Sequence, residues 1–165
     1  MRTTALQVDL VGLLEERQTR REFTRDLNEA ELGDFLWLAC RNRVSRPSPF
    51  GFDQESRPHP SAGGMHPIHV LLARAQQEWH RYEPVEHALV QLPGTRMTAA
   101  HARQESAVLV PLNRGVLIAL AAEPGKTAAK YDNSDSLVWR DAGTVLGYMS
   151  VVAEALGLTF AHWAF

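Results

Sequence analysis

Apolar residues return every three or four positions in three stretches of this chain, which is the spacing of one helix face. Asn28 precedes the second stretch and is suited to cap it, because its side-chain oxygen can accept a free N–H of the first turn. The third also carries Val151 on its outer surface, so we expect it to be covered nearly all round. These stretches read VDLVGLLEER, DLNEAELGDFLWLACRN and SLVWRDAGTVLGYMSVVAEALGL, and TRMTAAHARQESA is also predicted to be helical.

Short apolar runs predict the strands of one sheet. PIHVLLARA and GVLIALAAE are the strongest, and such runs are typical of strands buried in the middle of a sheet. WHRYEP and HALVQLPG are shorter and are joined by a turn at Glu83 and Pro84, so we expect a hairpin. TFAHWAF is predicted to be a last strand. Helices first, then strands mixed with helices, predict one α+β sandwich over residues 1–165.

Two segments lack a regular pattern. Residues 43–64 are rich in proline and glycine, and we interpret them as one long loop. Loops of that length within a compact domain are usually functional or mobile. Residues 1–8 are expected to be disordered.

Charge and composition narrow the functions that the chain could have. The formal net charge is -2, from 17 basic and 19 acidic residues, so no overall positive field would attract nucleic acid. No apolar run reaches membrane-spanning length, and the first residues do not resemble a signal peptide. Cys40 is the only cysteine, which excludes an internal disulfide, and its helical setting suggests a buried thiol. We therefore expect a cytoplasmic protein that binds neither nucleic acid nor membrane.

The segment ERQTRREF, residues 16–23, places three arginines around one threonine. Clustered guanidinium groups repel one another, and they bind phosphate through charge-assisted, bidentate hydrogen bonds. The segment therefore suggests an anion site. The alternative is a solvated basic patch at a helix end, paired with acids such as Glu15 and Glu16.

Two further motifs could carry chemistry. PSAGG, residues 60–64, consists of small residues that let the backbone approach a flat ring closely, although an ordinary turn before a strand would look the same. Lys130 and Tyr131 are notable because the chain has only two lysines against fifteen arginines. Lysine can release a proton and arginine cannot, so the pair suggests acid–base work. A solvated lysine beside a packing tyrosine remains the alternative.

The histidines and the cysteine argue for no further chemistry. On a strand, His66 and His69 would point to opposite faces, and no acidic partner is near in sequence, which speaks against zinc. The chain has no Gly-x-Ser-x-Gly motif, and Cys40 has no evident activating base. Nucleophilic hydrolysis and a metal site are therefore not expected.

Three motifs in this order resemble the flavin-dependent nitroreductase superfamily, in particular its SagB-type azoline dehydrogenase branch. RQTRREF is similar to the family's Arg-Arg-Ser-x-Arg-x-Phe, with Gln18 and Thr19 in place of arginine and serine. PSAGG matches the family's Pro-Ser-Ala-Gly loop before a strand, and the predicted hairpin follows it. The Lys-Tyr pair precedes an Asp-Ala-Gly helix that ends in ALGL, as it does in the family.

This resemblance implies a nitroreductase-like α+β sandwich, a mostly antiparallel sheet flanked by helices, and a homodimer or related subunit as partner. It implies FMN as the cofactor and an oxidoreductase that acts on a small molecule or on azoline rings in a peptide. Lys130 and Tyr131 would remove the ring proton while hydride passes to the flavin. The implied cofactor-binding residues are Arg17, Thr19 and Arg21 at the phosphate and ribityl chain, Ser61, Ala62 and Gly63 along the ring, and Ala164 near its reactive nitrogen.

The chain departs from the family near its end. Trp163 and Ala164 replace two glycines, and the indole of Trp163 would fill space at the flavin or stack on it. The family's further strand, which crosses to the partner subunit, has no counterpart before Phe165. We therefore expect weak FMN binding unless another chain completes the cleft. A non-catalytic subunit or binding module with a degenerate flavin cleft is the alternative.

Overall fold

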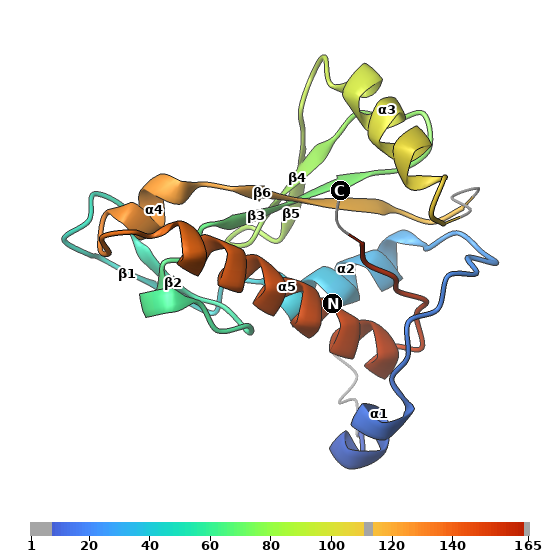
Figure 1. Ribbon diagram of the computed structural model, residues 1–165, viewed down its shortest axis with the longest axis horizontal. Coiled ribbons are helices and arrows are strands. Elements are labelled where there is room, and N and C mark those ends of the chain that lie inside the picture. Colours follow the sequence, from blue (N-terminus) through green and yellow to red (C-terminus); the bar gives the residue numbers. More distant parts are fainter. Residues whose placement is uncertain (1–7, 111–113, 164–165) are drawn as a thin grey trace.

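A four-stranded antiparallel sheet forms the centre of the computed structural model, which describes residues 8–110 and 114–163 (Figure 1). Almost all of the segment expected to be disordered, residues 1–8, lies outside them. The strands follow the order β5-β4-β3-β6. They are β3 (Ile68–Ala73), β4 (His80–Glu83), β5 (Ala88–Gln91) and β6 (Leu117–Ala122), which confirms the four strands predicted before the chain end.

Helices cover both faces of the sheet. The helices α2 (Glu29–Cys40) and α5 (Asp135–Ala155) lie on one face, and α3 (Arg96–Ser106) lies on the other (Figure 1). The short helices are α1 (Leu10–Glu16) and α4 (Pro124–Ala128). The larger apolar core lies between α2, α5 and the sheet, and a smaller one lies under α3. The predicted α+β sandwich with an antiparallel sheet is confirmed.

The apolar pattern explains how the two main helices sit. Asn28 caps α2, because its side chain accepts the N–H of Glu31 while Glu31 bonds back to the amide of Asn28. In α5, Val145 and Met149 are among the most buried side chains of the described chain. The outer side of α5 is not covered: Trp139 is 78% exposed, so the expectation of a helix buried all round is wrong for this chain alone.

The segment predicted to be one long loop has regular structure in it. The strands β1 (Val44–Arg46) and β2 (Gln54–Ser56) pair as an antiparallel hairpin, and a short 3-10 helix, η1, spans Ala62–Gly64. Each strand has only three residues and is polar, so neither shows the apolar alternation by which a strand is predicted.

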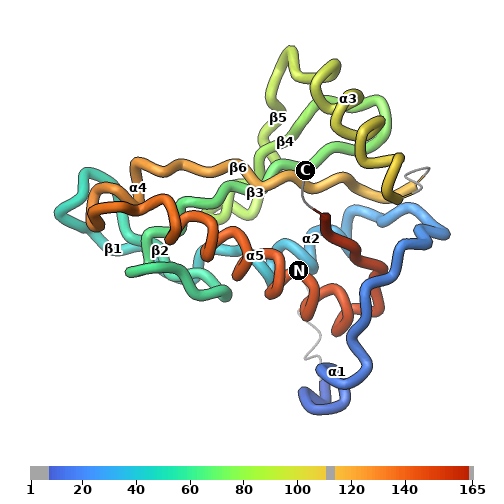
Figure 2. Tube along the Cα trace, in the orientation of Figure 1, coloured from blue at the N-terminus to red at the C-terminus, as the bar shows by residue number. Residues whose placement is uncertain are grey.

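The last predicted strand is absent from the described part of the segment TFAHWAF, residues 159–163. This segment does not pair with β6, the strand at the edge of the sheet, and Figure 2 shows it running from the end of α5 towards the sheet. Phe160 packs against the core beside α5, whereas Trp163 packs against the core under α3. No backbone ladder joins residues 159–163 to β6, so the described part of the segment is not a strand of the sheet. No helix within residues 8–110 and 114–163 has the length and apolar character needed to cross a membrane.

Candidate functional site

The loop of the PSAGG motif is fixed to α5 by one buried carboxyl group. The hydroxyl of Ser61 donates to Oδ2 of Asp141 at 2.6 Å, and the amide of Ala62 donates to Oδ1 at 2.9 Å. The Ser61 hydroxyl also accepts the amide N–H of His66 at 2.9 Å. Asp141 is only 4% exposed, so these donors satisfy a charge-bearing group that solvent does not reach. The loop thus has one defined position on the helix.

Gly63 is the point at which the loop meets the Lys-Tyr pair. Its carbonyl accepts Nζ of Lys130 at 3.3 Å and Nε2 of Gln54, from β2, at 2.6 Å. Its φ is +58°, and an added Cβ would lie 2.8 Å from Nζ of Lys130 and even closer to the Tyr131 hydroxyl. A side chain at this position is therefore excluded by conformation and by space. Residues 130–131 and two parts of the predicted long loop, the PSAGG motif and Gln54, converge here.

The arginine segment lies beside the C-terminal half of α5. Arg17 donates to the hydroxyl of Ser150 at 3.4 Å. Arg20 forms a two-pronged ion pair with Glu154, at 2.6 and 2.9 Å, so its guanidinium group is already paired with an acid. Hydrogen bonds from Arg20 hold the pKa of the Glu154 carboxyl below its ordinary value. Thr19 and Arg21 are exposed.

Within one chain, the arginine segment and the Ser61–Gly63 loop contact opposite sides of α5. At about 100° per residue, Ser150 lies about 180° around the helix from Asp141, and Glu154 about 220° from it. The rise of an α-helix also separates Asp141 and Ser150 by about 14 Å along the axis. Figure 1 shows α1 at one end of α5 and the β1–β2 hairpin at the other. Of the predicted cofactor-binding residues that the structure describes, the arginine segment and the Ser61–Gly63 loop are thus not brought together in a single chain.

A cavity of about 660 Å³ lies between β6, α5 and the C-terminal segment. Its walls are mostly apolar and include Phe23, two residues beyond Arg21, together with Leu146 and Trp163. Such walls suit the face of a flat ring. Trp163 is one side of this cavity and also packs against the core under α3. Ala164, predicted to lie near the flavin, falls outside the described residues.

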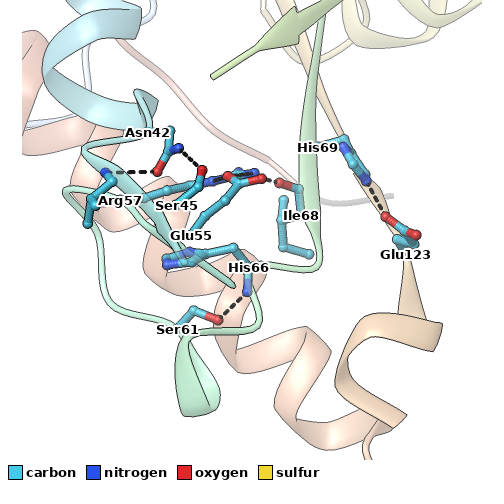
Figure 3. A network of polar contacts seen from close by, with 10 residues as sticks. Asn42, Ser45, Glu55, Arg57, Ser61, His66, Ile68, His69 and Glu123 are labelled. Carbon is cyan, nitrogen blue, oxygen red and sulfur yellow. Dashed lines mark hydrogen bonds and ion pairs between the residues drawn. The ribbon is translucent and has the colours of Figure 1, made fainter. Parts of the chain in front are cut away.

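Buried polar groups lie at the base of the Ser61–Gly63 loop (Figure 3). Arg57 is 6% exposed and pairs with Glu55 at 2.7 Å. His66 has a φ of +46° and lies just before β3. Its ring packs edge-on against His59 with centroids 5.0 Å apart. Burial, and then the charge of Arg57, lower the pKa of His66 to about 3.

The thiol of Cys40 and the ring of His69 lie in surroundings that suggest a structural role. Burial raises the pKa of the Cys40 thiol to about 12, which makes it a poor nucleophile and agrees with the predicted buried thiol. His69, on β3, contacts Glu123 at 2.8 Å. No group of three potential metal ligands occurs within the residues that the structure describes.

A comparison with protein families matches residues 14–161 to the Nitroreductase family, which is most of the chain. The chain belongs to the nitroreductase family. Members of this family generally bind flavin and are usually dimeric.

Solved structures share the nitroreductase fold at low sequence identity. A protein of Ralstonia eutropha JMP134 assigned as a nitroreductase superposes with a TM-score of 0.66 and 22% identity, over 95% of this chain and 69% of that one. A protein of Anabaena variabilis ATCC 29413, also assigned as a nitroreductase, superposes with a TM-score of 0.61 and 20% identity, over 74% of this chain and 26% of that one. A chain of the Escherichia coli microcin synthetase McbBCD complex with truncated pro-MccB17 superposes with a TM-score of 0.57 and 19% identity, over 95% of this chain and 63% of that one.

This nitroreductase-family chain thus spans less than two thirds of the length of two of those three chains. No curated protein matches it in sequence. Sequence reasoning missed two residues that organise the site, Asp141 and Gln54. A signal for Asp141 is present in the sequence, because an acidic residue at helical spacing between Val138 and Val145 falls on the apolar face of α5. Nothing in the sequence distinguishes Gln54 from other polar loop residues.

Proposed function

We propose that this chain is a subunit of an FMN-dependent oxidoreductase. The convergence of Lys130 and Tyr131 on the Gly63 turn carries the proposal, because it places a potential proton acceptor directly on the small-residue loop. In a nitroreductase-family fold, that combination supports removal of a substrate hydrogen as a proton and a hydride. A cytoplasmic location would suit this role.

The residues of this chain fit FMN in two separate parts. Arg17, Thr19 and Arg21 would hold the phosphate and ribityl oxygens through charge-assisted hydrogen bonds. Ser61, Ala62 and Gly63 would line the ring, with the Ser61 hydroxyl and the Ala62 amide already engaged by Asp141. Ala164 would lie near the ring's reactive nitrogen.

We further propose that each cleft forms between two copies of the chain. The helix α5 stands between the arginines and the Ser61–Gly63 loop of one chain, so one flavin would meet the arginines of one copy and the loop of the other. A homodimer with two such clefts has the symmetry expected of a small oligomer. It would also cover Trp139, which is 78% exposed in the single chain.

The chemistry proposed for the pair is acid–base catalysis. When bound, FMN would supply the hydride acceptor. Nζ of Lys130, once it has released its proton, would take a proton from the substrate carbon, and the Tyr131 hydroxyl beside it would orient that amine. The proposed substrate is an azoline ring in a peptide, which becomes an azole when it loses one proton and one hydride.

A second candidate is a non-catalytic subunit with a degenerate flavin cleft. Two observations favour it: Asp141 already occupies two donors of the Ser61–Gly63 loop, and Trp163 stands where the family has a glycine. Fluorescence titration of the purified protein with FMN separates the two candidates. No binding and no yellow colour would reject the oxidoreductase.

The phosphate assignment is tested with Arg17→Ala/Arg21→Ala. Each lost charge-assisted hydrogen bond should weaken FMN affinity about ten- to a hundred-fold. Arg20→Ala is the matched control, since Arg20 is paired with Glu154 and should leave the affinity within a few-fold of wild type. Equal affinity in the double variant and the wild type would reject the assignment.

Lys130→Ala and Tyr131→Phe test the chemical step. General acid–base groups contribute about 10²- to 10⁴-fold, so turnover of an azoline peptide should fall by that factor while FMN affinity stays unchanged. Wild-type turnover in both variants would leave Lys130 and Tyr131 with a structural role alone.

A further inference from the structure

The tip of the β1–β2 hairpin contacts both lysines of the sequence. Nζ of Lys130 lies 5.9 Å from the centroid of the Phe50 ring. Nζ of Lys126 lies 5.4 Å from the centroid of the Phe52 ring. Both distances are within the range of a cation–π interaction. One hairpin therefore holds two ammonium groups, each through a different ring.

The tip is built so that the two rings have fixed positions. The hydroxyl of Ser48 accepts the amide N–H of Phe50 at 3.2 Å and donates to the carbonyl of Phe52 at 2.5 Å. Gly51, between them, has a φ of +85°, which lets the chain reverse there. The ring centroids are 6.2 Å apart and the rings are tilted by 30°. Both phenylalanines are half-buried.

The same hairpin is hydrogen-bonded to the Ser61–Gly63 loop. Gln54, at the start of β2, donates to the carbonyl of Gly63, which also accepts Nζ of Lys130. The Lys130 ammonium thus lies between a carbonyl oxygen, the Phe50 ring and the Tyr131 ring, whose centroid is 5.6 Å away. Lys130 is otherwise exposed, so few other contacts restrain its long side chain.

We propose that Phe50 is a positioning residue that holds Nζ of Lys130 at the Gly63 carbonyl, and that the contact of Phe52 with Lys126 fastens the hairpin in place. The consequence for catalysis rests on the proposed function. The arrangement itself does not, because it requires only the residues of this chain.

Amine acylation measures this arrangement without flavin or substrate. The folded protein is treated with a limiting amount of an acetylating N-hydroxysuccinimide ester, and the peptides that contain Lys126 and Lys130 are quantified by mass spectrometry. In Phe50→Leu, the ring contact that restrains Nζ at the Gly63 carbonyl is lost, so the acylation rate of Lys130 should rise about two- to five-fold as the side chain becomes more accessible to the reagent. The rate of Lys126 should not change.

Two further variants sharpen the experiment. Phe52→Leu should give the reciprocal result, with faster acylation of Lys126 and an unchanged rate at Lys130. Phe50→Trp restores an aromatic face and should return Lys130 to the wild-type rate or below it. Equal acceleration of both lysines in either leucine variant, or no change in any variant, would overturn the assignment.

Turnover provides an independent readout in an active preparation. A residue that acts through Lys130 should lower kcat in Phe50→Leu and leave KM unchanged, and Phe50→Trp should restore kcat. A raised KM with unchanged kcat would overturn the positioning role. Because acylation requires neither flavin nor substrate, its failure is distinguishable from failure of the proposed oxidoreductase.

Discussion

The carboxyl group of Asp141 determines how the Ser61–Gly63 loop sits on α5. It accepts a hydroxyl and a backbone amide from consecutive loop residues, and it lies on the face of α5 that otherwise packs into the apolar core. A buried carboxyl without donors would cost several kcal/mol, so the loop and the helix depend on each other. These hydrogen bonds give the first residue of the Asp-Ala-Gly motif, Asp141, a structural role.

Asp141→Asn should destabilise the protein. The amide nitrogen of asparagine is a donor, so it would face either the Ser61 hydroxyl or the Ala62 amide and leave that group without an acceptor. The free energy of unfolding, measured with urea, should fall by about 1–3 kcal/mol. Asp132→Asn, on an exposed turn, is the control and should change it by less than about 0.5 kcal/mol. Similar effects in both variants would contradict this account.

His66 should make the stability depend on pH. Its pKa is lowered to about 3 in the folded protein, against an ordinary value of 6.5, so the unfolded chain binds its proton first. The contribution of neutral His66 to the free energy of unfolding is complete above pH 6.5 and is lost progressively as the pH falls towards 3. From pH 7.5 to pH 5.5, the free energy of unfolding should fall by about 1.4 kcal/mol through this group.

His66→Asn isolates that effect. Asparagine tolerates the positive φ of this position and does not titrate, so the decline between pH 7.5 and pH 5.5 should be smaller by that amount. His59 is retained as an internal reference, since burial lowers its pKa in the same direction. An unchanged pH dependence in the variant would show that His66 is not held neutral.

At the scale of elements, apolar periodicity predicts those that face the core. β3, β6 and α5 were found because buried residues recur in them at the expected spacing. The hairpin strands β1 and β2 were missed because their stability comes from pairing with each other and from polar contacts such as Gln54 to Gly63. Periodicity also cannot show where segments meet, which is why the convergence on Gly63 was not foreseen.

The C-terminal segment is an element of the core despite the absence of regular structure. Trp163 packs under α3, so Trp163→Ala should lower the free energy of unfolding by about 1–3 kcal/mol, somewhat less than for a fully buried tryptophan. His162→Ala, on the exposed neighbour, serves as the control in the same urea titration. A loss no larger than that of the control would mean that the indole contributes little to the core.

At the scale of the whole molecule, the decisive feature is where the two proposed FMN-binding groups lie, the arginine segment and the Ser61–Gly63 loop. Motifs that look like parts of one cleft in the sequence lie on opposite sides of α5 in the structure. The order of motifs along a chain carries no information about which copy completes which site. The symmetric dimer that we propose would resolve the separation, since each copy would contribute its arginines to one cleft and its Ser61–Gly63 loop to the other.

Subunit complementation tests this arrangement. One variant, Arg17→Ala/Arg21→Ala, lacks the phosphate contacts, and the other, Gly63→Ala, has a strained loop whose new Cβ would lie 2.8 Å from Nζ of Lys130. Each variant alone should bind FMN poorly. After refolding as a 1:1 mixture, half of the dimers are mixed and each has one intact cleft, so about one quarter of all sites should regain affinity.

The mixture distinguishes the two possible geometries because each chain carries only one defect. If both half-sites served the same cleft within one chain, every cleft would be damaged and no mixture could recover FMN binding. Refolding each variant with itself controls for effects of the refolding step, and circular dichroism verifies that both parents fold. Recovery near one quarter would place the arginines and the loop on different copies, because only a mixed dimer can then assemble an undamaged pair.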